Sequence, residues 1–83
     1  MMKNEFDVFY EVWARNHRED NRSLIRYYAK YERLGYLPQK EHSDLAQIQT
    51  KYGEHVVTLI IPYIKKEAHK INKIYHEFRE IVE

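Results

Sequence analysis

Apolar residues recur along most of the chain at intervals of three and four positions, which is the spacing of one face of an α-helix. Two glycines, Gly35 and Gly53, divide this pattern into three blocks. The last block holds the longest row, which consists of Val57, Ile61, Ile64, Ala68, Ile71, Tyr75, Phe78 and Val82, with Ile60, Ile74 and Ile81 on an adjacent row. An alternation sustained over this length predicts a long helix over residues 54–83.

Pro62 interrupts this last row. A proline inside a helix removes one hydrogen bond and clashes one turn back, at a cost of ~3 kcal/mol, so we expect the helix to kink there. The alternative is a strand over 55–61, where HVVTLII is rich in β-forming residues, with a helix that begins at Pro62. No other segment offers a convincing partner strand, and the pattern therefore favours the kinked helix.

The first block carries a shorter apolar stripe, which consists of Phe6, Phe9, Tyr10 and Trp13. This stripe predicts an amphipathic helix over about residues 4–18. The polar residues 15–23 that follow include several poor helix formers. We therefore expect a break near 19–22, with Asp20 as the N-cap of a second helix. One uninterrupted helix over 4–34 is the alternative.

Two further helices follow from the same spacing. The second helix would present Leu24, Tyr27, Tyr28, Tyr31 and Leu34 on one side. It would end at Gly35, because glycine readily adopts the left-handed conformation of a C-cap. After Pro38, the apolar residues Leu45, Ile48 and Tyr52 predict a short third helix that ends at Gly53.

These patterns together predict an all-α protein: a small three- or four-helix bundle with a long, Pro62-kinked C-terminal helix. A chain of 83 residues supports one hydrophobic core, so we expect a single helical domain over 1–83. With only two Gly and two Pro, the chain lacks the turn residues of a sandwich or barrel. The expected core side chains are Phe9, Trp13, Ile64, Ile71 and Phe78.

Composition narrows the class of protein. The chain is 43% hydrophobic and 33% charged, as globular proteins are, and it has no cysteine for disulfides or thiolate metal sites. Small secreted domains usually need disulfides, and the first residues include acidic side chains where a signal peptide is apolar. The longest uncharged stretch, from His55 to Ile64, is ten residues, about half of a membrane span. We expect a cytoplasmic protein with no membrane association.

The sequence offers no pattern typical of a catalytic or metal site. His55, His69 and His76 share one helical row, but at ~1.5 Å per residue their spacings place the rings at least ~10 Å apart. No glycine-rich phosphate loop is present, and no serine or threonine lies in a nucleophile elbow. We therefore expect a protein that is not an enzyme and that uses no cofactor or metal.

A row of basic residues is the clearest candidate for a binding surface. It consists of Arg15, Arg18, Arg22, Arg26, Lys30 and Arg33, at intervals of three and four. Residues 14–34 contain six basic and three acidic side chains, so this block has a charge of +3 in a chain of +1. Three interpretations remain open: a solvated helix face, a surface for a protein partner, or a face that grips nucleic acid with interleaved tyrosines.

The eight tyrosines add to the case for an interface, since tyrosine combines a large apolar ring with a polar tip. The leading hypothesis is a non-enzymatic protein-interaction factor that binds a larger cytoplasmic protein and inhibits or adapts it, as small bacterial and phage regulators do. A nucleic-acid-binding regulator that uses the basic Arg/Tyr face of residues 15–33 is the first alternative. An obligate oligomeric structural subunit is the second.

Two surfaces are candidates for the contact. The basic tyrosine face would contribute a rim, and the apolar stripe at the end of the long helix would be left uncovered by a short first helix. That stripe would pair with a second copy, giving a homodimer, or with the target protein. The candidate partner-binding residues are Arg26, Tyr28, Lys30, Arg33, Tyr36, Ile74, Phe78 and Ile81.

Overall fold

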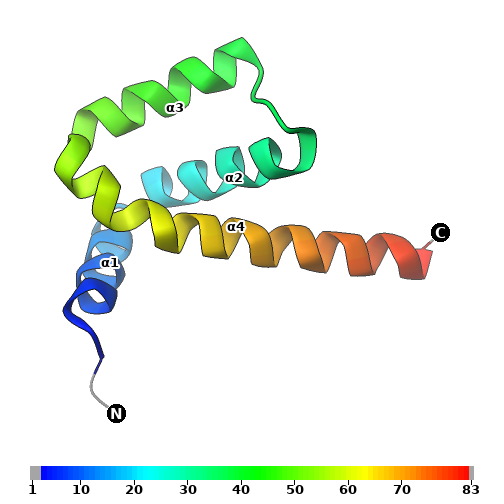
Figure 1. The fold of residues 1–83 in the computed structure, drawn as a ribbon, viewed down its shortest axis with the longest axis horizontal. Coiled ribbons are helices and arrows are strands. Elements are labelled where there is room, and N and C mark those ends of the chain that lie inside the picture. Colours follow the sequence, from blue (N-terminus) through cyan, green and yellow to red (C-terminus); the bar gives the residue numbers. More distant parts are fainter. Residues whose placement is uncertain (1–2, 83) are drawn as a thin grey trace.

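The computed structural model describes the backbone of residues 3–82 and the side chains of residues 3–77. It contains four helices, α1 (Glu5–Asn16), α2 (Arg18–Leu34), α3 (Gln39–Tyr52) and α4 (Glu54–Val82) (Figure 1). No strand occurs over the described backbone, and residues 55–61 belong to α4. The all-α prediction is confirmed, and the alternative strand is excluded.

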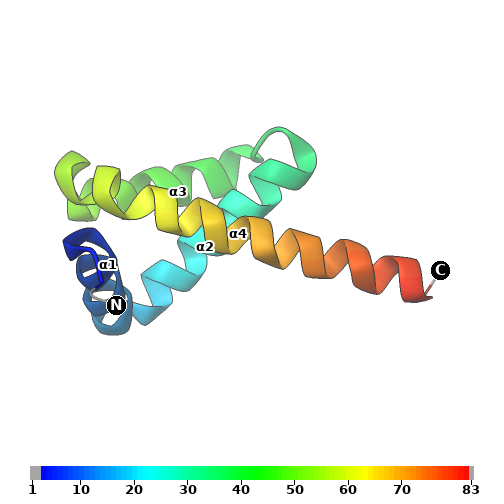
Figure 2. The same ribbon diagram turned by 60° about the horizontal axis from the view of Figure 1, so that its bottom comes forward.

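The helices form a flat body of 41 × 39 × 19 Å. The most extensive packing is between α2 and α4, while α3 contacts both of these helices. The shorter α1 packs against α2 and α4. In both ribbon views the C-terminal part of α4 extends beyond the other three helices (Figures 1 and 2).

A single residue, His17, separates α1 from α2. Its backbone angles, φ −132° and ψ 53°, lie outside the helical region, so the chain changes direction there. Its N–H donates to the carbonyl oxygen of Trp13 at 2.9 Å, and its own carbonyl accepts from the N–H of Asn21 at 2.9 Å. The predicted break is confirmed, but it lies at His17 rather than at residues 19–22. The backbone bends at His17 while the hydrogen bonds from one helical turn to the next continue through it.

Asp20 is not the N-cap that the sequence predicted. It lies in the first turn of α2, and its carboxylate accepts hydrogen bonds from the Tyr52 hydroxyl and from Lys51 Nζ. The carboxylate therefore joins α2 to the end of α3, a role that depends on tertiary contacts.

The other helix ends follow local rules. Asn4 caps α1, since its side chain accepts a hydrogen bond from the Phe6 N–H at 2.7 Å. Gly35 ends α2 in the left-handed conformation (φ 78°), with its N–H on the Tyr31 carbonyl oxygen at 2.7 Å. Gly53 ends α3 with φ 89°. The predicted helix ends at both glycines are confirmed.

The buried side chains of α4 follow one row rather than the predicted alternation. They are Ile60, Ile64, Ala68 and Asn72, each four positions after the last. Rows of every fourth residue are the ridges that pack when helices cross at an angle, whereas the 3–4 alternation suits helices aligned along their length. Ile64 is fully buried, as predicted, whereas Ile71 is 47% exposed, so the prediction for Ile71 is wrong.

The stripe of α1 is only partly buried. Trp13 belongs to the core with Leu24, Ile60 and Ile64, as predicted for Trp13. Tyr10 stacks on Tyr63 of α4, with 4.8 Å between ring centroids. Phe9 is 38% exposed, so its predicted place in the core is wrong. Tyr10, Trp13 and Ala14 define the inward face of α1, and Phe9 lies at the edge of that face. The predicted core residue Phe78 lies outside the described side chains.

Candidate functional site

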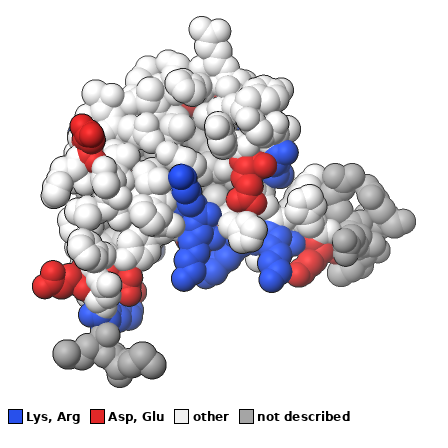
Figure 3. Space-filling model, in the orientation of Figure 1, with Lys and Arg blue, Asp and Glu red and all other residues white. Residues whose placement is uncertain are grey.

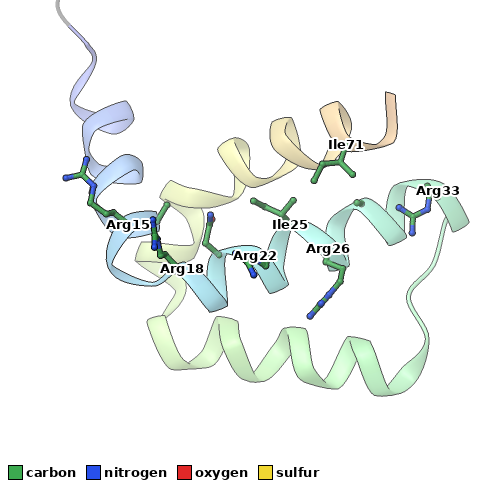
Figure 4. A pocket seen from close by; sticks show the side chains of 10 residues that line it. Arg15, Arg18, Arg22, Ile25, Arg26, Arg33 and Ile71 are labelled. Atoms are coloured by element: carbon green, nitrogen blue, oxygen red, sulfur yellow. The ribbon is translucent and has the colours of Figure 1, made fainter. Parts of the chain in front are cut away.

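A groove of about 700 Å³ lies at the meeting of α1, α2 and α4, and we call it the arginine groove. Its polar residues are Arg15, Arg18, Asn21, Arg22, Arg26 and Arg33. Its apolar residues are Ala14, Ile25, Ala29 and Ile71. In Figure 4 the arginines follow one another along α1 and α2, and Ile25 and Ile71 approach each other from α2 and α4.

The geometry of α2 explains why so many arginines meet here. Arg18, Arg22 and Arg26 are spaced four apart, so they project from one face of the helix. Arg15 precedes the bend at His17, yet it lines the same groove. The break in the helix therefore does not disperse the basic row.

None of these five arginines forms an ion pair with a carboxylate among the described side chains. The ion pairs present are Lys3–Glu11, Lys30–Glu41, Lys51–Asp20, Lys70–Glu67 and His69–Glu32. The five carboxylates in these pairs are thus bound to lysine or histidine, and the described lining of the groove contains no acidic residue. Among the described side chains, no carboxylate pairs with the positive charge of the groove.

This arrangement contrasts with the face seen in Figure 1. Figure 3 shows basic side chains in the middle of that face and acidic side chains to either side of them. Charges of both signs interspersed in this way are typical of an ordinary solvated surface. The groove departs from that pattern.

Holding like charges on one helix face costs stability. Each like-charge pair at four-residue spacing destabilises a helix by roughly 0.2–0.5 kcal/mol, and Arg18, Arg22 and Arg26 form two such pairs. Glu19, four positions after Arg15 and three before Arg22, offsets part of this cost, and the remaining excess of positive charge suits a ligand of negative charge. Arginine is well suited to that role, because its planar guanidinium pairs with carboxylates through two parallel hydrogen bonds.

Arg33 is the most firmly positioned of the five. Its Nη1 donates to Oδ1 of Asn72 at 2.9 Å, and its guanidinium carbon lies 5.8 Å from the ring centroid of Tyr75. Asn72 is itself 2% exposed and donates through Nδ2 to the Ala29 carbonyl oxygen at 3.0 Å. A buried amide on α4 thereby fixes a guanidinium at one end of the groove.

The tyrosines do not share this surface. The Tyr27 hydroxyl donates to Asp44 at 3.3 Å, and the Tyr28 hydroxyl accepts from Gln49 at 3.0 Å, so both tips contact α3. Tyr36 is exposed in the loop after α2. No tyrosine lines the groove, and the proposed Arg/Tyr face is divided between two sides of α2.

The remaining candidate residues are dispersed. Lys30 pairs with Glu41 of α3 at 2.5 Å and does not line the groove, although Arg26 and Arg33 do. Ile74 is 65% exposed on α4 and lies close in sequence to Ile71 of the groove. Phe78 and Ile81 lie outside the described side chains.

The four apolar residues of the groove, which we call its apolar floor, were not among the predicted binding residues. Ile25 and Ala29 sit one turn apart on α2 between the arginines, a spacing that is visible in the sequence. Ala14 and Ile71 join them only through packing of α1 and α4, and no local pattern pairs residues so far apart along the chain.

A second polar cluster links the α1–α2 junction to α3. The Tyr52 hydroxyl contacts His17 Nδ1 at 3.1 Å and donates to Asp20, which also accepts from Lys51 Nζ at 3.0 Å. Hydrogen bonds from Tyr52 and then from Lys51 lower the pKa of Asp20. Burial, followed by the bond to Asp20, raises the pKa of Tyr52. This cluster holds elements together, and each of its groups is satisfied by another.

One further bond secures α1 on α4. The Tyr63 hydroxyl donates to Oδ1 of Asp7 at 2.6 Å. The neighbouring carboxylate disfavours the phenolate and raises the pKa of Tyr63 to about 12.

Neither a metal centre nor a membrane span is found in the described residues. No three His, Asp or Glu side chains there lie close enough together to hold a metal ion. No described helix is both long enough and apolar enough to cross a membrane.

Comparison of the chain with protein-family models, with curated proteins and with solved structures finds no significant match.

Proposed function

We propose that this chain is a non-enzymatic protein-interaction factor that docks on a larger cytoplasmic protein through the arginine groove and modulates it. The observation that carries the proposal is the combination of an apolar floor with five arginines that have no counter-charge among the described residues. Protein interfaces combine an apolar centre with a polar rim, and arginine is enriched in them.

The chemistry of the lining supports binding rather than catalysis. The groove contains guanidinium, amide and aliphatic groups, and it contains no carboxylate, histidine, hydroxyl or thiol. Arginine stays protonated in proteins, so it does not act as a general base. Guanidinium groups in this setting recognise an anionic surface.

A protein partner fits the groove better than a nucleic acid. Unpaired bases bind by stacking on aromatic rings, and no aromatic residue is among the described side chains that line the groove. Phosphates alone would be attracted to the arginines, but they would leave Ile25 and Ile71 without an apolar partner. An acidic protein surface with apolar side chains would pair with the arginines and also cover Ile25 and Ile71.

The test is affinity capture from an extract of the source organism, with and without nuclease. Wild-type chain is compared with Arg22→Glu and with Lys40→Glu, a matched charge reversal on the exposed face of α3. We expect a protein that is retained after nuclease treatment, lost with Arg22→Glu and kept with Lys40→Glu.

Two outcomes would overturn the proposal. Capture that disappears with nuclease would favour a nucleic-acid-binding regulator. Equal capture by wild type and Arg22→Glu would remove the groove as the docking site. Circular dichroism of each variant establishes that a loss of capture does not come from unfolding.

A further inference from the structure

We propose that a second copy of this chain occupies the arginine groove, with the exposed face of its α1 lying against the apolar floor. Two complementary surfaces of the described residues carry this inference. The groove has positive charge over an apolar floor, and α1 has apolar side chains beside negative charge. The inference goes beyond the docking of a larger protein, and either one can fail without the other.

The exposed face of α1 is apolar. Its large exposed side chains are Phe6, Val8, Phe9 and Val12, each between 38% and 51% exposed. An amphipathic helix on a monomer normally turns such a face to the core, and contiguous exposed apolar patches mark contact sites. Tyr10 and Trp13 occupy the inward side of α1, on which Phe6 also lies, so Val8, Phe9 and Val12 remain for another molecule.

The same helix is acidic. Glu5, Asp7 and Glu11 give residues 5–12 a charge of −3, against five arginines in the groove. Glu5 and Glu11 are exposed. Glu11 pairs within the molecule only with the exposed Lys3, and exposed pairs of this kind are worth little, so its carboxylate is available to arginine.

The dimensions agree. The twelve residues of α1 span ~18 Å at ~1.5 Å per residue, and the part of α2 from Arg18 to Arg33 spans ~22 Å. The small side chains of Ala14 and Ala29 allow a helix to approach the floor closely. Val8 and Val12 are one turn apart and would then face Ile25 and Ile71.

With two-fold symmetry, the outer face of α1 and the arginine groove of each copy would both contact the other copy. In each copy α1 also supplies Ala14 and Arg15 to the groove, so the donor face and the acceptor groove adjoin. A symmetric dimer can place each α1 in the groove of the other copy, which closes the assembly. A protein partner of the groove would then compete with α1 of the second copy.

A charge-swap experiment tests this arrangement. The first variant is Glu5→Lys/Glu11→Lys, which reverses two charges on the helix, and the second is Arg18→Glu/Arg22→Glu, which reverses two charges in the groove. Sedimentation at ~10–200 µM measures the assembly of wild type, of each variant alone and of an equimolar mixture. Lys40→Glu/Lys65→Glu is the control, because it makes the charge change of the groove variant elsewhere.

We expect wild type and control to form dimers with a dissociation constant on the order of 10–100 µM. Dimerisation should weaken about tenfold or more when salt is raised from ~50 to ~500 mM, because charge pairs at a surface are screened. Each variant alone should be a monomer, since positions 5 and 11 of the helix and positions 18 and 22 of the groove then carry the same sign. The mixture should form dimers again, because both contacts regain opposite charges.

Restoration by mixing requires both variants to be folded, and circular dichroism of each variant establishes this before a mixture that stays monomeric is interpreted. A wild-type chain that stays monomeric at ~200 µM and low salt would overturn the inference. So would a mixture that stays monomeric, or variants that dimerise alone. A monomeric chain that still captures a protein partner through Arg22 would leave the proposed function intact.

Discussion

Asn72 on α4 accepts a hydrogen bond from Arg33 on α2, with 2.9 Å between Oδ1 and Nη1, while its own amide nitrogen donates to the Ala29 carbonyl oxygen at 3.0 Å. This one buried amide joins the two helices that pack most extensively, and it positions a guanidinium of the arginine groove. Fold and candidate site therefore depend on the same contact.

The first prediction concerns this pair. Asn72→Ala should lower the free energy of unfolding by about 1–3 kcal/mol, because hydrogen bonds between α2 and α4 are lost. A double-mutant cycle with Arg33→Ala, measured by urea denaturation, should give a coupling energy of ~0.5–1.5 kcal/mol. Additive effects of the two substitutions would show that the hydrogen bond contributes nothing to stability.

The second prediction compares two isoleucines on α4. Ile64 is fully buried and Ile74 is 65% exposed. Ile64→Ala should destabilise the protein by ~2–5 kcal/mol, since it leaves a cavity in the core. Ile74→Ala should change stability by less than ~0.5 kcal/mol in a dilute monomeric sample. Thermal unfolding followed by circular dichroism checks both, and equal losses would mean that α4 is packed on a different face.

The third prediction is that the groove is held at a cost to stability. Arg22→Glu replaces two repulsive pairs, with Arg18 and Arg26, by two attractive ones, and it replaces the attractive pair with Glu19 by a repulsive one. The free energy of unfolding should rise by about 0.5 kcal/mol, and the gain should shrink at high salt. Urea denaturation at two salt concentrations measures this, with Lys40→Glu as a control that makes the same change of charge outside the groove. A loss of stability on Arg22→Glu would mean that the arginine makes a favourable internal contact.

The fourth prediction follows from Tyr63 and Asp7. Because the pKa of Tyr63 is raised to about 12, folding favours the protonated phenol. The stabilisation is therefore complete below the ordinary tyrosine pKa of ~10 and is lost as pH rises through the folded value. Tyr63→Phe should be less stable than wild type at neutral pH, and the difference should disappear near pH ~12. Urea denaturation of both proteins from neutral pH to pH ~12 measures this difference in the free energy of unfolding. A difference that does not change with pH would show that it does not come from the bond between Tyr63 and Asp7.

The elements of this fold could be predicted from local sequence, because their signals are local. Helix ends at Gly35 and Gly53 depend on backbone conformations that glycine adopts easily, and the long C-terminal helix follows from spacing alone. The buried row of α4 could not be predicted in the same way. It depends on the angle at which α2 crosses, which brings Ile60 and Asn72 inward and leaves Ile71 at the groove.

The candidate site likewise has features that the sequence predicts and features that depend on how the helices pack. The arginine row was visible because its spacing matches one helix face, and it survives the bend at His17. Its separation from Tyr27 and Tyr28 was missed, since it depends on which side of α2 faces α3. The pairing of Lys30 with Glu41 and of Lys51 with Asp20 could not be predicted either, because it depends on how α2 packs against α3.

The central claim, that the arginine groove binds an acidic amphipathic helix, is tested most directly by nuclear magnetic resonance. A synthetic peptide of residues 3–16, which carries α1, is titrated into dilute isotope-labelled protein, and backbone amide shifts are followed. The account predicts saturable shift changes centred on Arg18, Arg22, Ile25 and Ile71, which disappear with Arg18→Glu/Arg22→Glu. Changes confined to α3, or no change at millimolar peptide, would contradict it.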